Sequence, residues 1–330
     1  MAEVLSAYGL GPTRSIATLG GTATQKWAVT TSSGRYVVRV RPAQSTAGEQ
    51  THRIHQTMIR LAAAGLPVPR PLARPGGETV LQHEGLTIEV LTWIGGDPWS
   101  AAVAGAAQGV GSFLGRFHAA LAGSCPGEDP LERREDHPDT VQPILHALLA
   151  HGGDPAQGHQ LKAINDLLEQ GRRELESSLY AALPRAVIHG DFHPGNVRFR
   201  GPEVVALYDF DYLAVQARVR DVVDALMFFA SDRPAPFQPD DIRSLTQPFK
   251  PNVSAARDLL AGYQSIRPLT NAEWQALPLL LRSRWIQMRL RGSRKLPIPD
   301  RIGFVLQDFS PVIAWLDDSG PDFFARLRGD

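Results

Sequence analysis

The chain has 330 residues, of which 43% are hydrophobic and 21% charged, so it can form an ample globular core, and its length favours two domains. Lys plus Arg and Asp plus Glu both number 34, so no net field attracts nucleic acid or an anionic membrane. Cys125 is the single cysteine, which excludes an intramolecular disulfide framework, and no stretch approaches the ~20 apolar residues that span a bilayer. We therefore expect a soluble cytoplasmic protein without nucleic-acid or membrane partners.

The N-terminal part, residues 1–94, has the pattern of a small antiparallel sheet. Residues 1–18 predict a short amphipathic segment and then a strand that leads into the glycine pair Gly20-Gly21. Alternating apolar residues separated by turn residues predict further strands at 26–30, 35–41, 79–82 and 87–93. A glycine pair between strands lets backbone N–H groups approach phosphate oxygens, although such turns are often purely structural.

One helix is expected within this β-rich part. Thr46 and Glu49 have the spacing of a capping box, which predicts a helix that runs to Ala64 and stops at Gly65. Glu49 is the only acid in that stretch.

From residue 95 onward the pattern becomes mainly helical. Apolar residues at three- and four-residue steps and capping signals predict helices at 101–121, 141–151, 159–180, 218–230, 253–264 and 270–291. The last of these opens with a second capping box, Thr270 to Glu273. We therefore expect a larger helical lobe over 95–330.

The stretch from Val187 to Asp211 carries the chemistry. Asp191 and Asn196 lie five residues apart in a loop, and two apolar, β-branched arms then flank Gly201-Pro202-Glu203, as in a hairpin. A fold within that turn lays Asn196 opposite Asp209. An amide oxygen and a carboxylate would then meet near Asp191, which predicts a hard-oxygen site suited to Mg²⁺.

The same loop allows a different interpretation. His189, Asp191 and His193 form a His-x-Asp-x-His pattern, which could begin a hydrolase metal site built on imidazoles. Such a site needs further ligands, and the other histidines are scattered without a repeated ligand spacing.

The pattern His-Gly-Asp-x-His-x-Gly-Asn, followed by a hairpin and Asp-Phe-x, resembles the aminoglycoside phosphotransferase and choline kinase branch of protein-kinase-like enzymes. The resemblance implies an α+β fold with two lobes, a small antiparallel β lobe (1–94) with one main helix and a larger, mostly helical lobe (95–330). It implies that Asp191 accepts the proton of the substrate hydroxyl, while Asn196 and Asp209 hold Mg²⁺ on the phosphates of ATP.

In the β lobe the resemblance implies that Gly20 and Gly21 cover ATP and that Arg39 holds its α- and β-phosphates, where protein kinases have lysine. Arg39 could instead be an outward-facing strand residue. The family also has a helix acid that pairs with this cation, and Glu49 is the candidate, although a capping acid already has a local role.

The resemblance further assigns His189 and Asp221 to the support of the catalytic loop. Asp221 could instead be an ordinary acid in a first helical turn. The run from Gly262 to Pro278 resembles type II homoserine kinases in particular. It implies transfer of the ATP γ-phosphoryl group to a hydroxyl of a small, homoserine-like amino acid or amino alcohol. Two alternatives remain, a protein Ser/Thr kinase and a nucleotide-binding scaffold with little turnover, and no oligomeric state is implied.

Overall fold

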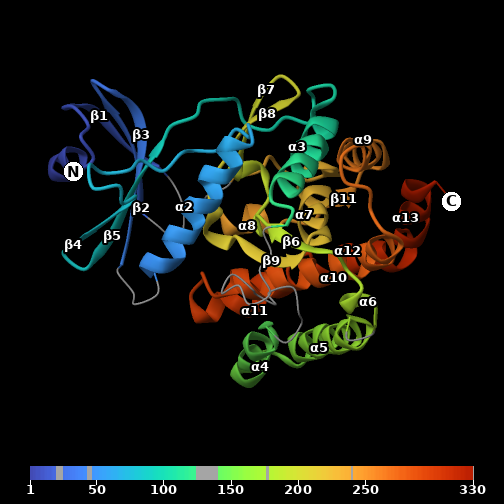
Figure 1. Ribbon diagram of the computed structural model, residues 1–330. Coiled ribbons are helices and arrows are strands. Elements are labelled where there is room, and N and C mark those ends of the chain that lie inside the picture. The colour runs from blue at the N-terminus through green and yellow to red at the C-terminus, as the bar shows by residue number, and fades with distance from the viewer. Residues whose placement is uncertain (20–24, 43–46, 124–139, 176–177, 239–240, 330) are drawn as a thin grey trace. The chain divides into compact units, whose positions relative to one another are not determined.

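The structure is a computed structural model that describes residues 1–19, 25–42, 47–123, 140–175, 178–238 and 241–329 (Figure 1). The chain folds into two compact units. Unit 1 contains Met1–Trp99 and Asn196–Tyr212, and unit 2 contains Ser100–Gly195 and Leu213–Asp330. Unit 1 therefore also includes the segment 196–212. The division into lobes at 1–94 and 95–330 stays a prediction.

Unit 1 is built on the expected five-stranded antiparallel sheet. Its strands are β1 (Thr13–Leu19), β2 (Gln25–Thr31), β3 (Gly34–Pro42), β4 (Val80–His83) and β5 (Leu86–Thr92). They hydrogen-bond in the order β1-β2-β3-β5-β4. The described residues of this part also form the helix α1 (Ala2–Ala7) and the longer α2 (Ala47–Ala63). The prediction of a β-rich part with one main helix is confirmed, and α2 ends before Gly65, whose φ of 80° a glycine adopts without strain.

An apolar core lies between the sheet and α1. It consists of Val4, Leu5, Tyr8, Val29, Val38, Ile88 and Val90. The Tyr8 hydroxyl donates within it to the carbonyl oxygens of Thr79 (3.1 Å) and Ile88 (3.0 Å), and burial raises the pKa of Tyr8 to about 12. Because side chains alternate along a strand, the neighbours of these core residues in β3 and β5 point to the opposite face of the sheet.

The hairpin β7 (Val197–Arg200) and β8 (Glu203–Leu207) completes unit 1. Gly201 takes a φ of 57°, as a glycine at the first position of a two-residue hairpin loop can. Phe199 and Asp97 exchange two backbone hydrogen bonds of 2.8 Å, so β7 is joined to the chain that follows β5.

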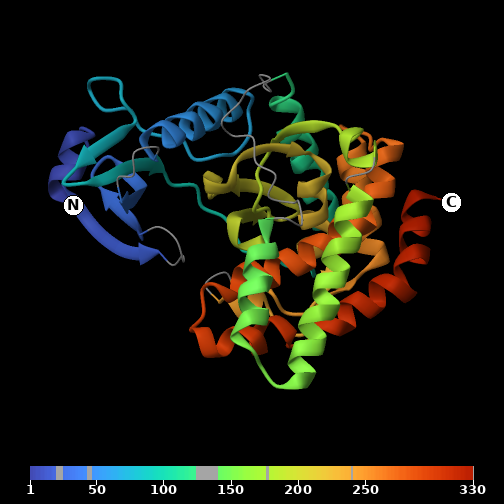
Figure 2. The same ribbon diagram turned by 90° about the horizontal axis from the view of Figure 1, so that it is seen from below.

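Unit 2 is mainly helical (Figure 2). Its helices are α3 (Ala106–Ala120), α4 (Gln142–His151), α5 (Pro155–Leu175), α6 (Ser178–Ala181), α7 (Val219–Phe229), α8 (Ile242–Leu245), α9 (Val253–Gln264), α10 (Asn271–Ser293), α11 (Arg301–Leu306), α12 (Phe309–Asp318) and α13 (Gly320–Arg328). The helix expected from residue 101 begins only at Ala106, because its N-cap Gly105 has a left-handed backbone with a φ of 77°.

Within the described part of unit 2, two short strand pairs were not predicted. β6 (Arg185–Ile188) pairs with β9 (Ala214–Ala217) antiparallel, and β10 (Ser231–Asp232) pairs with β11 (Lys250–Pro251). The first pair leads to two candidate site residues, since β6 is followed directly by His189 and β9 is followed by α7, which carries Asp221.

Candidate active site

The hairpin places Asn196 and Asp209 at its open end, as expected, but one residue out of the predicted register. Val197 pairs with Leu207 and Arg200 with Glu203, with an irregularity between Arg198 and Phe199. The backbone N–H of Tyr208 accordingly donates to the carbonyl oxygen of Asn196 at 2.8 Å. Asn196 therefore lies opposite Tyr208, and the prediction that it faces Asp209 is wrong by one residue. The difference arises at the turn, because Arg200 pairs with Glu203 and the loop is Gly201-Pro202 alone, and the irregularity between Arg198 and Phe199 restores one residue of the offset.

Asp209 follows this pair in a left-handed conformation, with a φ of 60°. Such a backbone costs a non-glycine residue ~1–2 kcal/mol, although Asp tolerates it better than most. Lys26 and Arg39 both contact its carboxylate: Lys26 Nζ lies 2.6 Å from Oδ2 and Arg39 Nη2 lies 3.3 Å from Oδ1. These contacts offset the backbone cost and fix the direction of the carboxylate.

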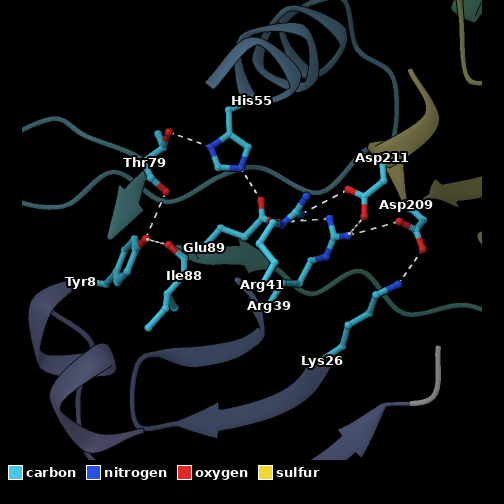
Figure 3. Close-up of polar contacts among 10 residues, drawn as sticks. All are labelled: Tyr8, Lys26, Arg39, Arg41, His55, Thr79, Ile88, Glu89, Asp209 and Asp211. Atoms are coloured by element: carbon cyan, nitrogen blue, oxygen red, sulfur yellow. Dashed lines mark hydrogen bonds and ion pairs between the residues drawn. The ribbon is translucent and has the colours of Figure 1, made fainter. Parts of the chain in front are cut away.

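A row of charges crosses the sheet on the face that bears Arg39. Lys26 on β2 is the register partner of Arg39 on β3, and Arg39 is the register partner of Glu89 on β5. Figure 3 shows Arg39 and Arg41 between Glu89 on one side and Asp209 and Asp211 on the other. Arg39 Nη1 lies 3.3 Å from Glu89 and Arg39 Nη2 lies 2.6 Å from Asp211.

Arg39 is buried, so it is not the outward-facing strand residue that the sequence left possible. Burial alone would lower the pKa of Arg39, but the carboxylates of Glu89, Asp211 and Asp209 raise it above its usual value. The guanidinium therefore stays charged. Within the described residues its buried Nε–H has no hydrogen-bond acceptor, and the same holds for Arg41. Anionic oxygens such as those of a phosphate would satisfy such donors.

Glu89 is the acid at the centre of this row, and it is 1% exposed. It pairs with Arg39 and Arg41 and lies 2.5 Å from Nε2 of His55, which α2 contributes. Burial would raise the pKa of Glu89, yet Arg39, the hydrogen bond from His55, and Arg41 together hold it well below its usual range. The other ring nitrogen of His55, Nδ1, lies 2.7 Å from Thr79 Oγ1.

The loop that carries Asp191 belongs to unit 2. His193 Nε2 lies 3.3 Å from Asp191 Oδ2, and His193 Nδ1 accepts the N–H of Gly195 at 3.1 Å. Burial would raise the pKa of Asp191, but the adjacent His193, then Arg284 and His189, hold it well below its usual range. Asp191, which is 27% exposed, is therefore an ionised hydrogen-bond acceptor at neutral pH.

Asp221, in the first turn of α7, contacts the backbone of this loop. Its carboxylate accepts the N–H groups of His189 (2.7 Å) and Gly190 (2.9 Å), and its Oδ2 lies 3.3 Å from Nε2 of His118. Burial would raise the pKa of Asp221, but the hydrogen bond and charge of His118 lower it instead. Asp221 is fully buried, so it is not a solvated acid at a helix start.

The imidazoles of His189 and His193 have backbone partners. Nδ1 of His189 accepts the N–H of Asp191 at 3.3 Å, as Nδ1 of His193 accepts that of Gly195. Among the described residues, no group of three or more His, Cys, Asp or Glu is arranged to hold a metal ion.

In the same part of the chain, no helix combines the length and the apolar character needed to span a membrane.

Three predicted site residues are described incompletely or not at all. Gly20 and Gly21 lie outside the described residues. Glu49 lies in α2, but its side chain is outside the described part. Their predicted contacts with nucleotide or with Arg39 therefore stay predictions.

The residues at the open end of the hairpin fit a divalent cation by their chemistry. Asn196 and Asp209 supply amide and carboxylate oxygens, the donors that Mg²⁺ prefers. A cation, the Lys26 ammonium, already lies against Asp209 Oδ2. Asn196 and Asp209 are therefore the residues that would hold a divalent cation at this end of the hairpin.

The sequence analysis missed four residues of this charge row and its surroundings: Lys26, His55, Glu89 and Asp211. The alternation of side chains along each strand could have indicated the orientation of two of them. Arg39 and Glu89 each lie between apolar residues that pack in the α1 core, so both side chains point to the opposite face of the sheet. The strand register that aligns them was not available.

A five-stranded sheet with one main helix, and a helical unit whose Asp-bearing loop is fixed by a buried carboxylate, define a protein-kinase-like phosphotransferase. The model of the phosphotransferase enzyme family matches residues 15–252. A homoserine kinase of Rhodopseudomonas palustris (strain BisA53) is 31% identical over 304 residues, which cover 90% of this chain and 85% of that enzyme. The chain belongs to the phosphotransferase enzyme family.

Solved structures agree on the fold. An amicoumacin kinase in complex with AMP-PNP and Ca²⁺ has a TM-score of 0.65 at 15% identity and covers 99% of this chain and 92% of its own. A microcompartment-associated aminopropanol kinase has a TM-score of 0.63 at 15% identity and covers 96% of this chain and 97% of its own. The expected family and fold class, and the expectation of an enzyme of kinase type, are confirmed.

Proposed function

We propose that this enzyme transfers the γ-phosphoryl group of ATP to the hydroxyl of a small amino acid or amino alcohol, with homoserine as the first candidate. The observation that carries the proposal is the extent of the likeness: the homoserine kinase of R. palustris aligns over nine tenths of this chain. The relatives do not favour the two alternatives, a protein kinase or a scaffold with little turnover. The lone Cys125 supports a cytoplasmic location.

In this proposal Asp191 aims the acceptor hydroxyl. Its lowered pKa makes it a weak base, so it accepts a hydrogen bond from the hydroxyl and takes the proton only late in the transfer. Phosphoryl transfer passes through a loose transition state in which positioning and charge stabilisation matter more than early proton removal. His193 holds Asp191 in place, and Asp221 holds the backbone from which it projects.

Arg39, with Gly20 and Gly21, would bind the phosphates, and Asn196 and Asp209 would hold Mg²⁺. The metal, when bound, neutralises charge on the phosphate oxygens. Arg39 and Lys26 both lie against Asp209, so the side chains that would meet the metal and the phosphates are already grouped.

A coupled assay of ATP consumption over homoserine, choline, an aminoglycoside and a generic protein acceptor tests the function. We expect turnover with homoserine or a close analogue, and a fall of at least ~10³-fold in kcat for Asp191→Asn with nearly unchanged MgATP affinity. Asp209→Ala should instead abolish Mg²⁺-dependent nucleotide binding. Equal turnover in the Asp191→Asn variant, or phosphorylation of the protein acceptor alone, would contradict the proposal.

A further inference from the structure

We propose that Glu89 on β5, held from α2 by His55, is the counterion that positions Arg39 for the nucleotide phosphates. The resemblance places this role on a helix acid, for which Glu49 is the candidate. The inference rests on the proposed function, since it concerns the same nucleotide, and it makes Glu89 and His55 positioning residues for the transfer.

Position along the helix separates the two candidates. Glu49 and His55 are six residues apart in α2, which is about 9 Å along the axis of an α-helix. His55 is the α2 residue whose ring lies against Glu89, and Glu89 is the register partner of Arg39. The acid that contacts Arg39 near His55 is therefore Glu89 of β5. Helix α2 contacts this acid through the imidazole of His55 (Figure 3).

The chemistry of each contact supports this role. Glu89 is an ionised carboxylate that can only accept, so Nε2 of His55 donates to it at 2.5 Å. Thr79 engages the other ring nitrogen at 2.7 Å, which fixes the ring plane. Both Glu89 and His55 are 1% exposed, so water cannot replace either contact.

The two terminal nitrogens of the Arg39 guanidinium contact different acids. Nη1 faces Glu89 at 3.3 Å, while Nη2 faces Asp209 and Asp211. Without Glu89, the hairpin carboxylates would be the remaining described anions beside Arg39, and the guanidinium would turn toward them. Arg41, which pairs with both Glu89 and Asp211, would lose one of its two acids as well.

The test measures ATP affinity and kinetics for Glu89→Gln and His55→Gln, alone and in an Arg39→Ala background. Because a hydrogen-bonded charge contact is removed, we expect Glu89→Gln to raise the KM for ATP about 10- to 100-fold, with the KM for the acceptor within twofold. His55→Gln should raise it about three- to tenfold. In the Arg39→Ala background the effect of either substitution on the KM for ATP should be several-fold smaller, because the larger part of it acts through Arg39 and only the contact of Glu89 with Arg41 remains.

Glu78→Gln is the matched control, since Glu78 is an exposed acid of the same unit that pairs only with Arg74 among the contacts of the described residues. Additive effects of Glu89→Gln and Arg39→Ala on ATP affinity would overturn the inference, because they would mean that Glu89 supports the fold and not Arg39. A loss in Glu49→Gln without a loss in Glu89→Gln would overturn it too. If Glu89→Gln does not fold, the His55→Gln cycle decides alone. Absence of ATP binding by the wild-type protein would instead remove the proposed function.

Discussion

Asp221 illustrates how one residue can organise a catalytic loop. It is fully buried, and its two oxygens accept consecutive backbone N–H groups at the point where β6 ends. His118 contacts the same carboxylate and is itself held by the Tyr263 hydroxyl at 2.9 Å from its Nδ1. Tyr263 lies in the run that resembles homoserine kinases. One residue of that run therefore supports the catalytic loop through His118 and Asp221.

Asp221→Asn tests this arrangement. An amide can present only one oxygen, so one loop N–H would face an NH₂ group and lose its acceptor. We expect the free energy of unfolding to fall by about 2 kcal/mol and kcat to fall more than the KM for ATP changes. Urea unfolding and steady-state kinetics measure both. Asp258→Asn, an exposed change on α9, is the control, and equal effects of the two variants would show that the contact has no special role.

At the scale of elements, glycines set how closely α3 and α9 approach. A Cβ on Gly111 would lie 1.8 Å from the carbonyl oxygen of Leu259, and one on Gly262 would lie 2.2 Å from that of Gln108. Both contacts are with backbone, so no side-chain rotation could relieve them. The close crossing brings Tyr263 of α9 and His118 of α3 within hydrogen-bond distance.

Gly111→Ala should therefore destabilise the protein, whereas an alanine usually stabilises a helix. We expect a loss of about 1–3 kcal/mol from the forced separation of the helices. Gly171→Ala on α5 is the matched control, since nothing lies within 4 Å of the added methyl, and it should gain about 0.5–1 kcal/mol. Chemical denaturation of both variants provides the comparison. A gain in stability for Gly111→Ala would contradict the close helix contact.

Local signals predicted the elements better than their pairings. The capping box of α10 is present as expected: Thr270 Oγ1 accepts the N–H of Glu273 and Glu273 accepts that of Thr270. The sequence could not show that Glu273 also binds Arg218 through two hydrogen bonds of 2.7 Å, because that contact spans 55 residues. Hairpin existence was likewise predictable, but its bulge was not.

For the whole molecule, the sequence predicted the β-rich and helical parts and the family because those features rest on periodicity and on a compact motif. It did not predict the charge row of Lys26, Arg39 and Glu89, which depends on the register of three strands. Nor did it predict that the His55 ring is buried against Glu89, since a histidine on a polar helix is usually solvated. Long-range pairing decides both, and no local pattern encodes it.

The buried carboxylates also determine how the protein as a whole responds to acid. The pKa values of Glu89, Asp191 and Asp221 are all lowered in the folded state. Each group therefore adds stability above the pKa of an unfolded carboxylate, about 4, and this contribution is lost as the pH falls toward the folded value. Protonation of Glu89 would in addition leave Arg39 and Arg41 with less compensating charge.

We expect the unfolding midpoint in urea to stay nearly constant from pH 7 to about 5 and to fall steeply below about pH 4. Glu89→Gln removes one of the three groups, so its difference from the wild type should be largest at pH 7 and should shrink below about pH 4. Glu78→Gln, which changes an exposed acid, should follow the wild-type curve at every pH. A decline that begins near pH 6.5, where histidines ordinarily titrate, would mean that imidazoles and not these carboxylates govern the acid response.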